Sequence, residues 1–296
     1  MIKETEIESL LIFLQKHNLN ELELFKHNTP QMKIVMQNFY KLCQAILPID
    51  SSSYDLIIEL VKQFHYIHHL SDLLEEKLLE NPNTKNFFTN NDHPILLLAN
   101  EDQNSSSSAL TLMNILVQKL YGLYSIPYRN REHTIAILNQ KALEKISKEE
   151  KIILIDDFIG TGNKIIKAQK KIKEAAPHIT IKIFAVCIMD EGFNSIISNG
   201  ILQEDVQYLF LKNKVISDST NMNESEKKLK KKKLQSITNV FCINKKLTGL
   251  GYKNSEALFK INSHNTPNNI IDIFHEDFIP EHDFCSIFPR IKKNKG

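Results

Sequence analysis

The sequence predicts an α/β protein with a mainly parallel, doubly wound sheet and an N-terminal helical subdomain. From residue 94 onward, apolar runs typical of buried strands alternate with helical segments, in the order strand–helix–strand–strand–helix–strand–helix–strand. Before that point, apolar side chains recur at helical spacing. We therefore expect a helical region over residues 1–88 and an α/β domain over residues 89–296 that ends in hood or cap elements.

The composition supports a large folded core and argues against a disulfide framework, a zinc ribbon or a membrane span. The chain has 296 residues, 42% of them hydrophobic, and a net charge of +2, which does not demand a nucleic-acid partner. Its four cysteines are scattered without a CxxC pair, which argues against a zinc ribbon or a disulfide framework. The first ten residues carry charges, and no apolar run is long enough to cross a bilayer. We expect a cytoplasmic protein without a membrane partner.

The helical region is expected to hold three or four helices, of which the longest covers Tyr54–Leu79. His65 and His69 lie four residues apart there, a spacing that brings two metal ligands to one helix face. No further acidic ligand is implied, so we favour partly exposed histidines over a metal site. This region is also where we expect a protein partner to dock.

The α/β domain is expected to place its polar loops together. Parallel strands end at the same edge of a sheet, and ligands of such sheets bind at the carboxyl ends of the strands. Three segments fall on that edge, namely residues 100–108, residues 156–164 and Met189–Glu191. The strands that lead to them and complete the sheet are expected over residues 94–99, 134–138, 152–155, 179–188 and 206–211.

The central stretch, Lys151–Ala168, carries the clearest chemistry. A buried strand over residues 152–155 leads to Asp156 and Asp157, and then to a turn in which two glycines flank Thr161. Asn163 can cap the helix that follows, and backbone amides at such a helix start attract phosphate. Carboxylates at this position accept hydrogen bonds from sugar hydroxyls or lie near a hydrated Mg²⁺. Both halves together fit a ribose 5-phosphate.

This stretch resembles the motif of the type I phosphoribosyltransferases that binds 5-phosphoribosyl 1-pyrophosphate (PRPP), usually Asp-Asp-Val-x-Thr-Thr-Gly-x-Thr. The chain matches it at both acids, Thr161 and Gly162, and departs from it at Gly160, where Thr is common, and at Lys164, where Thr or Ser is common. Lys164 would replace a hydroxyl contact with a charge. Walker A and dinucleotide fingerprints fit less well, because Gly-Lys-Ser/Thr and a third glycine are missing. The remaining alternative is an ordinary loop with exposed acids.

The resemblance implies roles for individual residues. Asp156 and Asp157 would hold the ribose hydroxyls and, through water, Mg²⁺. The 5-phosphate would lie on Phe158, Ile159, Gly160, Thr161, Gly162, Asn163 and Lys164. Pyrophosphate would meet Asn104, Ser105, Ser106 and Ser107, together with Arg129 or Arg131. Family members usually have glycine and a basic residue in that first loop, whereas this loop has acids. A serine-rich helix cap and ordinary surface arginines are the alternatives.

The C-terminal part carries two further features. Gly-Tyr, His-Asn-Thr-Pro-Asn-Asn and Phe-Pro-Arg segments are similar to those of a divergent phosphoribosyltransferase-like group of bacterial conflict (defence) systems, and the likeness spans about residues 90–290. It makes His264, Asn265 and Asn269 candidate hood contacts, with common turns as the alternative. The lysine run at residues 227–233 is read as a solvated helix face, and nucleic-acid docking stays as the alternative.

Three functions follow. The first is a phosphoribosyltransferase that uses PRPP with Mg²⁺, passes phosphoribose to an unknown acceptor and releases pyrophosphate. The second is a non-catalytic sensor or effector that binds PRPP or a nucleotide and signals through the N-terminal helices. The acids at Glu101 and Asp102 favour the second, because they would repel pyrophosphate. The third is a module that docks nucleic acid through the lysine run.

Overall fold

The computed structural model describes residues 4–27, 29–89, 95–98, 108–124, 136–137, 151–282 and 284–290. The chain forms two compact units. One is a sheet unit, residues 69–212, and the other is a two-segment unit built from residues 1–68 and 213–296. This grouping differs from the division at residues 88 and 89 that the sequence suggested, because the first helices share a hydrophobic core with the end of the chain.

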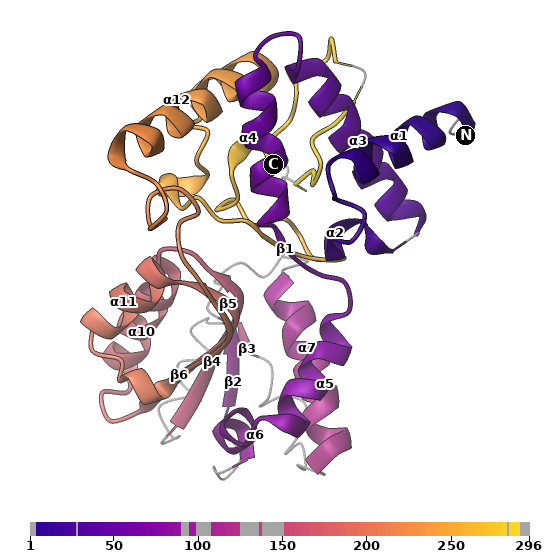
Figure 1. Cartoon of the computed structure of the whole chain (residues 1–296). Coiled ribbons are helices and arrows are strands. Elements are labelled where there is room, and N and C mark those ends of the chain that lie inside the picture. Colours follow the sequence, from indigo (N-terminus) through magenta and orange to yellow (C-terminus); the bar gives the residue numbers. More distant parts are fainter. Residues whose placement is uncertain are drawn as a thin grey trace. The chain divides into compact units, whose positions relative to one another are not determined.

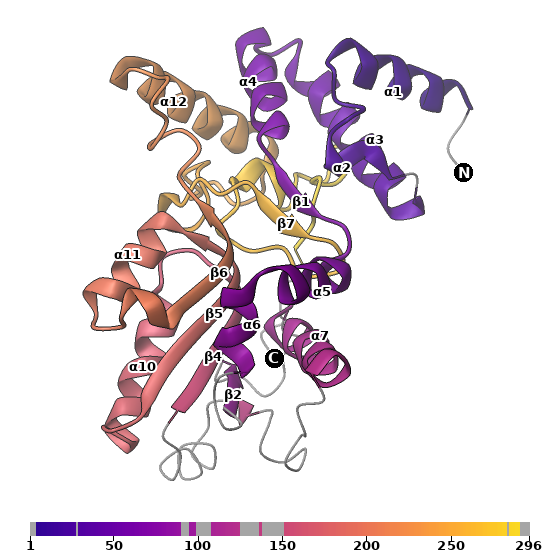
Figure 2. The ribbon, with the colours of Figure 1, turned by 60° about the horizontal axis from the view of Figure 1, so that its bottom comes forward.

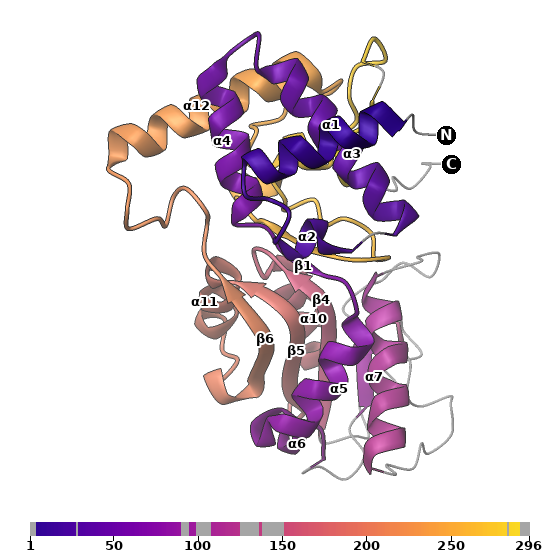
Figure 3. The same ribbon diagram turned by 45° about the vertical axis from the view of Figure 1, so that its right-hand side comes forward.

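Within its described residues, the sheet unit contains five parallel strands in the order β3-β2-β4-β5-β6. These strands are β2 (Ile95–Leu98), β3 (Ala136–Ile137), β4 (Lys151–Ile159), β5 (Thr180–Met189) and β6 (Val206–Lys212). The helices described in this unit are α5 (Leu70–Glu80), α6 (Pro82–Thr89), α7 (Ser108–Tyr124), α10 (Asn163–Ala175) and α11 (Asp190–Ser198), with a short 3₁₀ turn, η1 (Gln203–Asp205). Helices α10 and α11 lie on one face of the sheet and α5 and α7 on the other (Figures 1 and 3). The predicted α/β class with parallel strands is confirmed.

The strand order creates one natural place for a ligand. From β2 the chain first forms a neighbour on one side, β3, and then one on the other side, β4. Relabelled from the first strand, the order is 2-1-3-4-5, in which ligands bind at the carboxyl ends of the two strands where the direction reverses. Here those strands are β2 and β4. The central motif therefore lies at the carboxyl end of one of them, β4.

Two elements of the sheet unit differ from the sequence prediction. Strand β4 runs on to Ile159 and includes both acids, whereas a strand over residues 152–155 was expected. It continues because Phe158 and Ile159 pair with the long neighbouring strand β5. Helix α11 begins at Asp190, so Asp190 and Glu191 lie in its first turn, where acids are favourable, and not in a loop.

The two-segment unit packs helices from both ends of the chain around one core. Its helices are α1 (Glu4–Lys16), α2 (Glu23–Lys26), α3 (Pro30–Ile46), α4 (Ser51–Lys62) and α12 (Glu224–Phe241), with 3₁₀ turns η2 (Tyr252–Asn254) and η3 (Asp272–Phe274). Strand β1 (His65–Ile67) pairs in parallel with β7 (Phe259–Ile261), and Figure 2 shows the two strands side by side. The described helices include none that is long and apolar enough to cross a membrane.

The long helix predicted over Tyr54–Leu79 is wrong. The chain leaves helix α4 after Lys62, forms β1 and re-enters a helix only at Leu70. Residues 64–67 are Phe-His-Tyr-Ile, and aromatic and β-branched residues favour a strand. His65 also stacks on Phe259 of the paired strand, β7. His65 and His69 therefore do not share a helix face. The metal site that their spacing suggested as an alternative does not form.

Candidate functional site

The two acids of the motif are buried inside strand β4. Asp156 is 4% exposed and Asp157 is 6% exposed, so the alternative of a loop with exposed acids is wrong. Ile152, Leu154 and Ile159 of the same strand belong to one hydrophobic cluster. The acids are therefore set within a buried strand of the sheet.

Lys164, two residues into helix α10, forms an ion pair with the first acid. Its Nζ donates to Oδ2 of Asp156 at 2.9 Å, while Oδ1 of the same carboxylate accepts the backbone N–H of Asp157 at 3.1 Å. Burial raises the pKa of Asp156 to about 6; Lys164 opposes this rise and Asp157 adds to it. Burial lowers the pKa of Lys164, but the two carboxylates outweigh that effect, so its pKa lies above the usual value.

The turn after the acids opens directly into helix α10. Gly162 has φ +75°, a left-handed conformation that suits glycine, and it forms the N-cap of the helix. Asn163 was expected as the cap, but it lies inside the helix and donates from Nδ2 to Oγ1 of Thr161 at 2.9 Å. The first-turn amides of a helix lack intrahelical acceptors, and this turn carries Lys164 and no acid. The helix start therefore attracts an anion.

Gly192, which the sequence reasoning missed, holds this turn in place. A Cβ on Gly192 would lie 2.3 Å from the carbonyl oxygen of Gly160, and a Cβ on Gly162 would lie 2.9 Å from that of Gly192. The first turn of α11 thus packs backbone to backbone against the motif. A signal was available: glycine occurs only eight times in the chain, and Gly192 follows the strand next to the motif.

Asp156 fits poorly as a direct ligand of Mg²⁺. Both oxygens of Asp156 already accept hydrogen bonds from donors of the chain itself, one of them a charged ammonium group. Mg²⁺ prefers oxygen ligands in octahedral geometry and keeps several of its waters. Direct coordination by Asp156 would require it to exchange Lys164 for the metal, so we assign no mechanistic step at these residues to a metal.

The other predicted site residues fall into two groups. Asn104, Ser105, Ser106, Ser107, Arg129 and Arg131 lie outside the described residues. The predicted hood residues belong to the two-segment unit, whereas the acids belong to the sheet unit. Within their own unit, the backbone carbonyl of Asn269 accepts the hydroxyl of Ser255 at 2.5 Å, and that of His264 accepts Nζ of Lys260. Asn265 accepts from the N–H of Thr266 through Oδ1 at 3.0 Å.

The lysine run lies on helix α12, and part of its charge is neutralised within the chain. Three of its lysines form ion pairs: Lys227 with Glu224 at 3.0 Å, Lys230 with Glu59 at 2.5 Å and Lys231 with Glu256 at 3.3 Å. Two of these pairs join α12 to other parts of the two-segment unit. The helix therefore uses some of its lysines for internal packing.

Among the described residues of the two-segment unit, two groups of metal-ligand type occur that were not foreseen. In each group, potential ligand atoms of three side chains lie within 4.8 Å of one another. The groups are Glu23, His27 and His68, and Asp272, His275 and Glu276. In the first group, Glu23 already pairs with Lys26 at 3.0 Å, which competes with a cation.

The parallel sheet, its reversal point and the turn that follows buried acids define a phosphoribosyltransferase-like protein. A family model described as PRTase-CE matches residues 35–290, which is most of the chain. The chain therefore belongs to the PRTase-CE family, and the resemblance inferred from the central motif is confirmed. No curated protein matches the chain.

Proposed function

We propose that the sheet unit binds PRPP through its ribose 5-phosphate part and transfers phosphoribose to an acceptor. The carrying observation is the position of Asp156 and Asp157, buried at the reversal point of the sheet and followed at once by a glycine turn and a helix start. Acceptors for ribose hydroxyls and donors for a phosphate are thereby brought next to each other.

The proposed reaction places modest demands on the protein. A nucleophile bonds to C1 of the ribose, the bond from C1 to the pyrophosphate oxygen breaks, and pyrophosphate leaves with the electron pair. The transition state resembles an oxocarbenium ion, so fixed ribose geometry and nearby negative charge favour it. Asp156 and Asp157 would orient the ring through its hydroxyls, and residues 160–164 would hold the 5-phosphate. Mg²⁺, when bound with the pyrophosphate, neutralises charge on the leaving group.

Titration calorimetry with PRPP and Mg²⁺, together with a pyrophosphate-release assay, tests this proposal. Asp157→Asn keeps the size of the side chain but removes its charge, and we expect it to weaken PRPP binding by about tenfold or more, the loss typical of a charged hydrogen bond. Glu174→Gln, an exposed acid near the end of α10, is the matched control and should bind as the parent does. Absence of PRPP binding, or equal binding by Asp157→Asn, contradicts the proposal.

A second candidate keeps the binding and omits the transfer. In the sequence, Glu101 and Asp102 stand where the family usually has small and basic residues, and acids there would oppose the leaving pyrophosphate. On this proposal the chain senses PRPP or a nucleotide and passes the signal to a protein partner through its N-terminal helices, as a sensor or effector of a defence system. PRPP binding without pyrophosphate release, with any tested acceptor, supports it; steady pyrophosphate release excludes it.

A further inference from the structure

The position of Lys164 distinguishes this site from the motif it resembles, where a small hydroxyl residue is common. The Asp156 side chain is 5% exposed, whereas that of Lys164 is 40% exposed. The side chain of Lys164 therefore runs from the partly exposed surface of the turn to a buried carboxylate. Lys164 also lies in the first turn of α10, so its charge adds to that of the backbone amides at the same helix start.

An ammonium group has three N–H donors. Among the described residues, Lys164 donates one of them to Asp156, at 2.9 Å. The geometry leaves Lys164 able to keep this bond and to donate toward a phosphate at the helix start, because lysine binds phosphate as a compact point charge. A divalent cation between an acid and a phosphate would perform the same two tasks.

We propose that Lys164 is the built-in cation of this site: it takes the position at Asp156 that a divalent metal would otherwise fill, and it binds the 5-phosphate of the sugar directly. This inference rests on the proposed binding of a ribose 5-phosphate group. It assigns the specificity for a terminal phosphate monoester to Lys164 together with the amides of α10. It also means that Mg²⁺ is needed only at the pyrophosphate. Binding of the ribose 5-phosphate part of the ligand does not require the metal.

Ribose 5-phosphate, which lacks pyrophosphate, is the probe that isolates this half of the ligand. We expect the parent protein to bind it with affinities that agree within about twofold in Mg²⁺ and in EDTA. Lys164→Thr restores a residue common in the resembled motif and should weaken binding in EDTA by about tenfold or more, since a charged contact is lost. Added Mg²⁺ should recover part of that loss, because the acids are then available to a hydrated metal.

Two further variants make the test specific. Lys164→Arg keeps the positive charge and should retain binding in EDTA. Lys167→Thr removes an exposed lysine one turn along the same helix and should bind as the parent does. Thermal unfolding establishes that each variant is folded, and the parent comparison in Mg²⁺ and EDTA needs no variant at all.

The outcomes separate the inference from the proposed function. Binding of ribose 5-phosphate by the parent that requires Mg²⁺ overturns the inference, as does unchanged binding by Lys164→Thr in EDTA; in either case PRPP binding itself still stands. If neither ribose 5-phosphate nor PRPP binds to any folded variant, the proposed function fails and the inference fails with it.

Discussion

The carbonyl oxygen of Gly160 lies so close to Gly192 that a Cβ added to Gly192 would come within 2.3 Å of it. Both glycines follow strands that are neighbours in the sheet, β4 and β5. The contact is backbone to backbone, so no flexible side chain can move aside to relieve a clash. It fixes where the motif turn lies relative to helix α11.

We expect Gly192→Ala to destabilise the sheet unit by about 1–3 kcal/mol, the usual cost of overpacking, and to weaken ligand binding because the turn must shift. Chemical unfolding and calorimetry with PRPP measure the two effects. Gly122→Ala is the matched control: it lies in helix α7 with nothing within 4 Å of the added Cβ. It should stabilise the unit by up to about 1 kcal/mol, because alanine favours helix more than glycine does. Equal stability of both variants would contradict this account.

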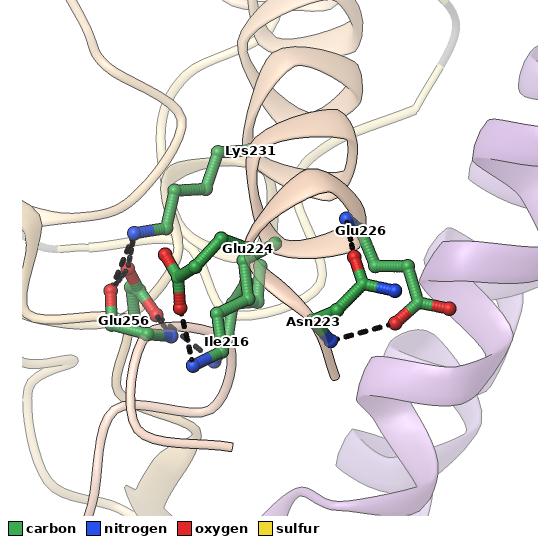
Figure 4. A network of polar contacts seen from close by, with 8 residues as sticks. Ile216, Asn223, Glu224, Glu226, Lys231 and Glu256 are labelled. Carbon is green, nitrogen blue, oxygen red and sulfur yellow. Dashed lines mark hydrogen bonds and ion pairs between the residues drawn. The ribbon is translucent and has the colours of Figure 1, made fainter. Parts of the chain in front are cut away.

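Glu256 is expected to be a stability determinant of the two-segment unit. Its carboxylate is fully buried and accepts the N–H groups of Ile216 and Ser217 at 2.9 and 2.7 Å. It also pairs with Lys231, and Figure 4 shows Glu256 with Ile216 and Lys231. Glu256→Ala would leave these donors without their acceptor, so we expect a loss of about 3–5 kcal/mol in urea unfolding.

Lys232→Met, on an exposed position of the same helix, is the control for the Glu256 variant and should change stability by no more than about 0.5 kcal/mol. A loss below about 1 kcal/mol for Glu256→Ala would contradict this prediction. It would show that the contacts of Glu256 stabilise the fold little more than hydrogen bonds to water do.

Asp272 should make stability depend on pH. Burial raises its pKa from the ordinary 3.8 to about 6, although the backbone N–H groups of Gly251 and Gly249 oppose the rise. The folded chain thus binds this proton more tightly than the unfolded chain does. The resulting stabilisation is complete below about pH 3.8 and is lost as the pH rises through about 6. Asp272→Asn, neutral at every pH, should gain on the parent over that window by at most about 3 kcal/mol.

Urea unfolding at several pH values between about 4 and 8 measures this difference. Asp277→Asn removes an exposed acid nearby and is the control. Its difference from the parent should change little over the same window. A constant difference between Asp272→Asn and the parent across that range would contradict the predicted linkage.

The ion pair between Lys230 and Glu59 should couple helix α12 to helix α4. Nζ of Lys230 donates to both carboxylate oxygens, at 2.6 and 2.5 Å. A double-mutant cycle with Lys230→Met and Glu59→Gln should give a coupling of about 0.2–1 kcal/mol, since both groups are partly exposed. The coupling should decrease in high salt. A coupling that is zero at low salt would mean that the pair does not hold the helices together.

The sequence predicted the α/β class well because β2, β4 and β5 contain apolar runs bounded by turn residues and alternating with helical segments. Local chemistry also marked the motif, since adjacent acids before a glycine turn are informative wherever they occur. The family resemblance followed from the same few residues. The sequence alone did not predict the length of β4, because that length depends on pairing with β5.

The features that the sequence analysis mispredicted or missed share a physical cause. Each depends on contacts between residues distant in the chain. Phe64–Ile67 has apolar spacing that suits either a helix or a strand, and its pairing with Phe259–Ile261 decides the matter. Lys164 was expected to contact a ligand, but only the folded chain reveals Asp156 as its partner. The role of Gly192 likewise depends on a neighbouring strand and helix.

The parallel pair β1 and β7 has a consequence for how the protein is made. Helices α1–α4 and β1 leave the ribosome first, then the entire sheet unit, and only afterwards the segment after residue 212 that completes their core. During synthesis the sheet unit can fold while the early helices still expose apolar side chains such as Leu56 and Val61. Those helices are therefore the part of the nascent chain that a chaperone would protect. Truncation after residue 212 would remove the segment that completes their hydrophobic core.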